Sequence, residues 1–242
     1  MRLRLRQFRP RTGPHEHRLV QPLRPLRHTS LRAPEPVGLL LGDHDGLSRL
    51  AGLFSFAACS RHTLVHVPLR GGAPPDEGVG EPVDLLLVHH SYGLRTSMWP
   101  ALRRALGPGG PLSVRTDEAR TARDAAAWRG RQEGSGRQER PDRRDELRHV
   151  THARTLILFG SRDVFAETAI SLAHAAGWGP RRRDVDKGHP EPMTVLPLVE
   201  PPGRGGGHPD DVMVCFKAYP PYAHFRRPGE PARRPHRPAA AP

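Results

Sequence analysis

The chain has 242 residues and a formal net charge of +13, and all but two of its 38 basic residues are arginine. This length allows one α/β domain with tails or two small domains. The composition excludes a disulfide framework, because there are two cysteines, and it shows neither the apolar stretch of a secretory signal nor the roughly 18 apolar residues of a membrane span. We therefore expect a cytoplasmic protein with no membrane partner.

The N-terminal segment over 1–36 is rich in arginine and proline and has no sustained apolar period. Because proline interrupts regular structure, this segment predicts a disordered basic arm. The similar composition over 226–242 predicts a disordered tail. Apolar residues concentrate between the two, so we interpret 37–225 as an α/β domain.

The apolar pattern of this domain predicts strands alternating with helices. Leu47, Leu50 and Phe54 recur at helical steps, and the apolar run after Val83 is typical of a strand covered on both faces. The predicted strands cover 37–41, 63–67, 83–88, 112–115, 155–159 and 212–216. The predicted helices cover 47–58, 98–106 and 164–176, the last with Asp163 as its N-cap.

This alternation favours a Rossmann-like three-layer domain with a mostly parallel sheet. The arginine-rich stretch over 117–154 interrupts the alternation and has little apolar surface to bury. We interpret it as an insertion or linker. Its residues 117–129 are compatible with a helix.

Residues 84–93 read DLLLVHHSYG and residues 102–114 read LRRALGPGGPLSV. These runs predict a strand, a helix, a Pro-Gly-Gly turn and a further strand in this order. Over about 83–115 this order resembles the second half of class I S-adenosylmethionine-dependent methyltransferases. The first run is similar to amino-group DNA methyltransferases, whose strand ends in an Asp-Pro-Pro-Tyr-Gly type of motif. Tyr92 and Gly93 match that motif, whereas His89, His90 and Ser91 replace its acid and prolines.

The resemblance implies a methyltransferase-like protein, or a degenerate relative, acting on nucleic acid. It implies that His89, Ser91 and Tyr92 face the target base. For the cofactor S-adenosylmethionine, it points to the turn at Phe159, Gly160 and Ser161, with Asp184 or Asp186 as the ribose-binding acid. The family's second glycine is missing from this turn, and an ordinary strand-to-helix bend would have the same residues. Tyr219-Pro-Pro-Tyr222 competes for the catalytic role.

A serine hydrolase of the α/β-hydrolase type is the alternative enzyme. The run HHSYG resembles a Gly-x-Ser-x-Gly nucleophile elbow with histidine at its first position. Ser91, Asp163 and His189 follow in the order nucleophile, acid and base of that family. No His-Gly oxyanion segment follows the strand over 37–41.

The histidine pairs His62/His66 and His149/His152 have spacings typical of metal ligands. His62 and His66 flank a predicted strand and would stand about 13 Å apart, which excludes shared chelation. We expect solvated histidines and no metal site.

The arginine-rich segments can neutralise phosphates, so DNA or RNA is the expected partner. Arginine, proline and glycine also have GC-rich codons. A third hypothesis is therefore a non-enzymatic basic protein, or a product that is partly out of frame.

Overall fold

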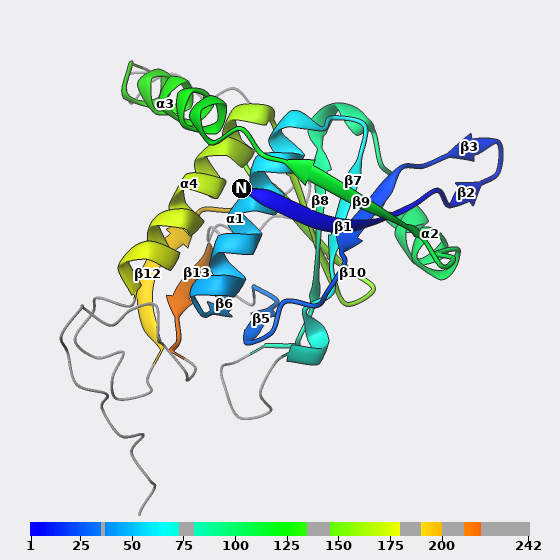
Figure 1. Ribbon diagram of the computed structural model, residues 1–242, viewed down its shortest axis with the longest axis horizontal. Coiled ribbons are helices and arrows are strands. Elements are labelled where there is room, and N and C mark those ends of the chain that lie inside the picture. The colour runs from blue at the N-terminus through cyan, green and yellow to red at the C-terminus, as the bar shows by residue number, and fades with distance from the viewer. Residues whose placement is uncertain (35–36, 73–79, 135–145, 180–189, 200–210, 219–242) are drawn as a thin grey trace, which may run out of the picture.

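The computed structural model describes residues 1–34, 37–72, 80–134, 146–179, 190–199 and 211–218. These residues form a mixed α/β fold with two main sheets (Figure 1). The seven-stranded sheet has the order β10-β11-β8-β7-β4-β1-β9, with β1 (Arg2–Phe8), β4 (Leu19–Pro22), β7 (Leu64–Val67), β8 (Asp84–His89), β9 (Gly110–Arg115), β10 (Arg148–His152) and β11 (Thr155–Gly160).

The four-stranded sheet has the order β12-β13-β6-β5, with β5 (Thr29–Arg32), β6 (Val37–Gly42), β12 (Glu191–Leu196) and β13 (Asp211–Phe216). A small hairpin consists of β2 (Arg11–Thr12) and β3 (His15–Glu16). The α-helices are α1 (His44–Cys59), α2 (Trp99–Arg104), α3 (Glu118–Gly134) and α4 (Arg162–Trp178). Three short 3-10 helices are η1 (Arg70–Gly72), η2 (His90–Tyr92) and η3 (Thr96–Met98).

The α/β class is confirmed, but the sheets are mixed rather than mostly parallel. Three of the ten strand pairings are parallel, namely β4 with β7, β8 with β11, and β6 with β13. The chain often turns back directly, as between β10 and β11, where the sequence pattern indicated an insertion or linker before the strand over 155–159. Such a direct return places consecutive strands antiparallel.

Two apolar clusters lie on opposite faces of the seven-stranded sheet, because successive strand residues point to opposite sides. The larger cluster includes Leu85 and Leu87 and joins this sheet to α1, α4 and the small sheet. The smaller cluster includes Leu86 and Val88 and lies under α2. Helices α1 and α4 pack side by side and contact strands of both sheets (Figure 1). They therefore lie between two sheets, unlike the outer helices of a Rossmann-like fold.

The expected disordered arm over 1–36 is wrong for its described residues. β1 pairs with β4 on one side and with β9 on the other, and β5 joins the small sheet. Within β1, Leu3 and Leu5 are buried, while Arg2, Arg4 and Arg6, which alternate with them, are exposed. The alternation of period two predicts a half-buried strand, and the high charge of the segment concealed it.

The expected insertion over 117–154 is also wrong for its described part, although the helix that was compatible with 117–129 is found as α3. Helix α3 packs against α4 and hydrogen-bonds to α1 through Thr121 and Ser55, whose hydroxyl oxygens are 2.6 Å apart. Its Asp124 forms an ion pair with Arg162 of α4 at 2.5 Å. β10 then pairs with β11. The tail over 226–242 lies outside the described residues.

The remaining predicted elements are found close to their expected bounds, with one change at a cap. Ser161, not Asp163, is the N-cap of α4, and its hydroxyl accepts the backbone N–H of Val164. Both cysteines, exposed Cys59 and buried Cys215, are free. Among the described helices, none combines the length and apolarity needed to cross a membrane.

Candidate functional site

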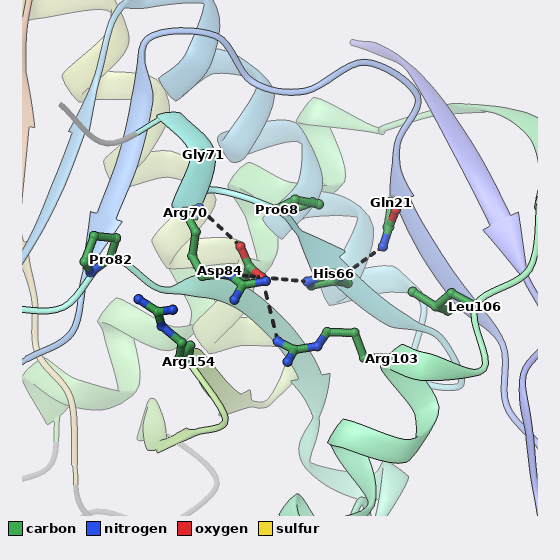
Figure 2. Close-up of a pocket in the computed structure, with 10 residues that line it drawn as sticks. All are labelled: Gln21, His66, Pro68, Arg70, Gly71, Pro82, Asp84, Arg103, Leu106 and Arg154. Atoms are coloured by element: carbon green, nitrogen blue, oxygen red, sulfur yellow. Dashed lines mark hydrogen bonds and ion pairs between the residues drawn. The ribbon is translucent and has the colours of Figure 1, made fainter. Parts of the chain in front are cut away.

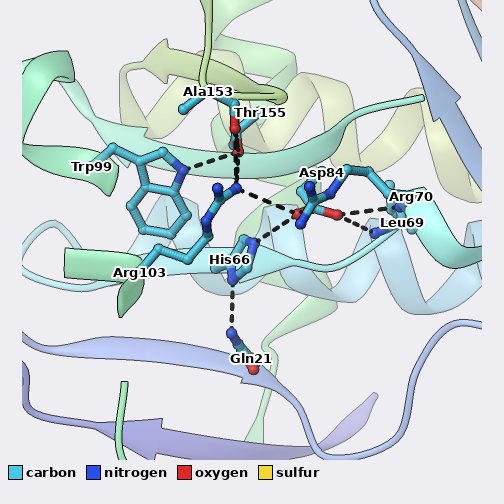
Figure 3. A network of polar contacts seen from close by, with 9 residues as sticks. All are labelled: Gln21, His66, Leu69, Arg70, Asp84, Trp99, Arg103, Ala153 and Thr155. Carbon is cyan, nitrogen blue, oxygen red and sulfur yellow. Dashed lines mark hydrogen bonds and ion pairs between the residues drawn. The ribbon is translucent and has the colours of Figure 1, made fainter. Parts of the chain in front are cut away.

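A buried carboxylate lies at the start of β8, in a strand that is otherwise apolar. The Asp84 side chain is 3% exposed, so its charge requires partners within the protein. Its Oδ1 accepts the backbone N–H groups of Leu69 and Arg70 at 3.0 and 3.2 Å, and its Oδ2 accepts Nε of Arg70 at 2.8 Å. Figure 3 shows these contacts on one side of Asp84, with His66 and Arg103 on the other.

These partners keep Asp84 ionised. Burial alone would raise the pKa of the carboxyl, but the facing N–H of His66 and the backbone N–H groups of Arg70 and Leu69 outweigh it and lower the pKa to about 2. A carboxylate that accepts several N–H groups is stabilised in its charged form. Asp84 is therefore a fixed negative charge at neutral pH.

His66, on the neighbouring strand β7, faces Asp84 and is 4% exposed. Burial lowers the pKa of His66 despite the nearby carboxylate, so its ring is neutral at pH 7. Nδ1 accepts the side-chain N–H of Gln21 at 2.7 Å, which leaves the proton on Nε2, 3.6 Å from Oδ2 of Asp84. The indole of Trp99 packs edge-on against the ring, with centroids 4.9 Å apart.

Arg103, from α2, approaches Asp84 from the opposite side to Arg70. Its Nη1 lies 4.0 Å from Oδ2 of Asp84 and donates to the carbonyl of Ala153 at 3.0 Å. In the same region, Thr155 at the start of β11 accepts the indole N–H of Trp99 at 2.9 Å. These contacts attach α2 to the amino ends of β8 and β11 and hold the Arg103 guanidinium beside the carboxylate.

A strained turn brings a third arginine to the same place. Ala153 and Arg154 connect β10 and β11 with φ values of 50° and 57°. A two-residue hairpin turn with φ positive at both positions normally uses Asn-Gly or Asp-Gly. For other residues this conformation costs about 1–2 kcal/mol each. Strain of this kind is often retained near binding and catalytic sites.

A pocket of about 570 Å³ lies here, and its lining includes Gln21, His66, Asp84 and the three arginines (Figure 2). Arg70, Arg103 and Arg154 reach it from three separate parts of the fold and surround Asp84. With His66 neutral, three positive charges face one negative charge. Within the described part of the chain, Arg154 forms no ion pair or side-chain hydrogen bond.

The residues expected to face a target base lie at the other end of β8. His89 is the N-cap of η2, and its Nδ1 is 2.8 Å from the hydroxyl of Ser91. The phenol oxygen of Tyr92 forms a hydrogen bond with Nδ1 of His17 at 2.8 Å, and Nε2 of His17 faces the hydroxyl of Thr12 at 2.8 Å. His89 and Ser91 thus form a local cap, whereas Tyr92 is engaged with the segment around the β2–β3 hairpin.

The expected cofactor turn is next to these residues, because β11 runs parallel to β8 with Gly160 opposite His89. A Cβ atom at Gly160 would lie 2.8 Å from the ring of Phe165, so that ring fills the space beside the glycine. The Ser161 hydroxyl caps α4. The turn therefore does not offer the open approach that S-adenosylmethionine needs from a glycine. Asp184 and Asp186 lie outside the described residues.

Of the hydrolase trio, Ser91 and Asp163 are described. Asp163 forms an ion pair with Arg131 of α3 at 2.8 Å. His189 lies outside the described residues, as do Tyr219 and Tyr222. Among the residues that the structure describes, the histidine in contact with Ser91 is His89, two residues away.

The expectation of solvated histidines is wrong for His66 and His149, which are 4% and 5% exposed. Among the residues the structure describes, no group of three or more His, Cys, Asp or Glu side chains is placed to hold a metal ion. The pocket residues were missed as a site because their signal is weak. It consists of a charged residue, Asp84, at the start of an apolar strand, and a histidine, His66, inside another.

Comparison with known proteins finds no matching family model, no curated relative and no similar solved structure. Functional assignment therefore depends on the geometry and charge of the chain itself.

Proposed function

We propose that the protein binds a phosphate-bearing ligand in the pocket around Asp84. The observation that carries the proposal is the convergence of Arg70, Arg103 and Arg154 on a pocket with one carboxylate. The volume of about 570 Å³ is within the range of small-molecule sites. A net positive pocket of this size favours an anionic ligand.

The role of Asp84 is to position the arginines rather than to oppose the ligand. Its two oxygens accept N–H groups of Leu69 and Arg70, so one edge of the Arg70 guanidinium is fixed, and Nε2 of His66 lies 3.6 Å away. A guanidinium has five N–H donors arranged as a fork that matches phosphate or carboxylate oxygens. The remaining donors of Arg70 and Arg103, and all those of Arg154, are the groups that would bind the ligand.

The test is titration calorimetry with inorganic phosphate and pyrophosphate, with acetate as the carboxylate arm. A charge-assisted hydrogen bond contributes about 1.5–3 kcal/mol, so Arg154→Gln should weaken phosphate binding at least about tenfold. Arg123→Gln is the matched control, because Arg123 lies exposed on α3 and its substitution removes the same charge. No phosphate binding at millimolar concentration, or equal losses in both variants, would contradict the proposal. Tighter binding of acetate than of phosphate would reassign the ligand to a carboxylate.

Methyltransferase activity with S-adenosylmethionine is the second candidate. It is favoured by the parallel pairing of β8 and β11, which brings the turn at Gly160 beside His89. It is supported less well than phosphate binding, because Phe165 fills the space beside that glycine. Titration with S-adenosylmethionine and S-adenosylhomocysteine tests it, and no heat with either at millimolar concentration would exclude it.

A further inference from the structure

One face of the seven-stranded sheet carries a row of exposed arginines. In β1, Arg2, Arg4 and Arg6 are exposed and alternate with residues of the core. Alternate residues on a strand share a face and lie about 6.6–6.8 Å apart. On the neighbouring edge strand β9, Arg115 is opposite Arg2 and is also exposed. We call these four residues the arginine row.

The arginine row and the pocket lie on the same face of this sheet. Arg6 is directly opposite Gln21 of β4, and Gln21 donates to His66 of β7, which lines the pocket. Residues opposite one another in a ladder point to the same side. Two strand spacings of about 4.8 Å therefore separate β1 from β7, or about 10 Å. One continuous ligand can span both.

The charges of the row are not neutralised nearby. Within the described chain, Arg4 and Arg6 form no ion pair or side-chain hydrogen bond, and Arg2 donates to the hydroxyl of Ser113 at 2.9 Å. The acids closest in sequence to Arg115 are engaged elsewhere. Asp117 accepts the backbone N–H of Arg120, and Glu118 pairs with the N-terminal amine of Met1.

The composition of this face distinguishes between macromolecular partners. On β9 its exposed residues are Pro111, Ser113 and Arg115, and on β1 they are arginines. Protein interfaces depend on buried aromatic or aliphatic anchors, which these exposed positions lack. Nucleic-acid interfaces are more polar and more positive. Without aromatic residues for base stacking, contacts would go to phosphates and not to the bases.

We infer that the ligand is a single strand of nucleic acid whose terminal phosphate enters the pocket while its following phosphates contact the arginine row. This inference rests on the proposed function, because the pocket must first accept a phosphate. It places the binding surface for DNA or RNA on a folded sheet face and not on disordered arms.

Fluorescence anisotropy with labelled 12-nucleotide DNA strands bearing a 5′ phosphate, a 3′ phosphate or no phosphate tests the inference. One of the two phosphorylated strands, either the 5′ or the 3′ form, should bind about tenfold more tightly than the unphosphorylated strand, because its terminal phosphate adds one charged contact. In the double variant Arg4→Gln/Arg6→Gln, the slope of log affinity against log salt should become shallower by about 1.4, because each lost contact to a single strand contributes about 0.7. Arg123→Gln, which removes an exposed charge on α3, should leave the slope unchanged.

The outcomes separate the two proposals. If inorganic phosphate binds but the double variant in the arginine row binds DNA as tightly as the native chain, the inference is overturned and the pocket proposal stands. If phosphate does not bind and a terminal phosphate has no effect, both fail. Polyglutamate of equal charge serves as a competitor of the labelled strand. If it competes as well as unlabelled DNA does, the surface binds polyanions nonspecifically and the assignment to nucleic acid is overturned.

Discussion

At the residue scale, His89 predicts a loss of stability in mild acid. Burial, followed by the neighbouring charges of His90, Arg61 and His62, lowers the pKa of His89 from 6.5 to about 4. Its Nδ1 accepts the backbone N–H of Ser91, so it must remain unprotonated to keep the cap. Between pH 6.5 and 4 the unfolded chain binds a proton that the folded chain excludes. The contribution of His89 is therefore complete above pH 6.5 and is lost as the pH falls towards 4.

The variant His89→Asn should flatten this pH dependence, because asparagine caps a helix without titrating in this range. We expect the melting temperatures of the variant and the native chain to converge as the pH is lowered from 7 to 4, measured by circular dichroism. His15→Asn is the control, because His15 is exposed in β3 and is not among the groups that shift the pKa of His89, and it should retain the native pH profile. If His89→Asn kept the native pH profile, the His89 ring would not be the group that sets the change of melting temperature with pH.

The candidate site could be predicted only in part from its residues. Sequence patterns locate strand β8 and therefore place Asp84 and His89 at its two ends. They do not indicate which end carries a pocket, because Arg70, Arg103 and Arg154 come from segments far apart in the chain. Their convergence depends on pairing of β8 with both β7 and β11, and the sequence does not specify that pairing.

At the element scale, the β10–β11 hairpin predicts a conflict between stability and binding. Arg154→Gly should relieve the left-handed strain at φ 57°, partly offset by the greater flexibility of glycine in the unfolded chain. We expect a net gain of about 0.5–1 kcal/mol, or a rise of about 1–4 °C in melting temperature. The same variant should bind phosphate at least about tenfold more weakly, as calorimetry can measure.

The variant Ala153→Asn separates the two effects within the same turn. Asparagine tolerates the left-handed region better than alanine, and Arg154 is retained. Its melting temperature should rise while phosphate affinity stays at the native value. A fall in melting temperature in both variants would show that the turn is not strained.

Elements with a clear apolar period were predictable, whereas the charged segment over 117–154 was compatible with a helix over 117–129 but did not indicate how that helix packs. Helix α1 combines a three-to-four-residue apolar step with the cap Asp43, which accepts the N–H of Gly46 at 2.8 Å. In contrast, α3 buries little beyond Ala125 and Thr121 and is held to α4 by ion pairs such as Arg162 with Asp124. Ion pairing between distant segments leaves no periodic signal in either of them.

At the scale of the whole molecule, the N-terminal strand is predicted to be essential for folding. Leu3, Leu5 and Phe8 are at most 6% exposed and belong to the two apolar clusters. Burial of each side chain contributes about 1.5–3 kcal/mol, and a whole domain has only about 5–15 kcal/mol of net stability. Deletion of residues 2–8 should therefore abolish the cooperative unfolding transition in calorimetry.

The triple variant Arg2→Gln/Arg4→Gln/Arg6→Gln is the matched control for this deletion. It keeps the strand and its buried leucines and removes only exposed charge. Its melting temperature should stay within a few degrees of the native value, because surface substitutions usually change stability by less than about 0.5 kcal/mol. A cooperative transition in the deletion variant would show that β1 is dispensable.

The position of β1 between β4 and β9 also has a consequence for synthesis on the ribosome. β1 is made before its partner β9, which is completed roughly 100 residues later. At about 5–20 residues per second, one edge of β1 waits some 5–20 s for its partner. An unpaired edge strand can capture a strand of another chain, and charged residues on it discourage this. The alternating arginines would thus protect the nascent chain from aggregation before they meet any ligand.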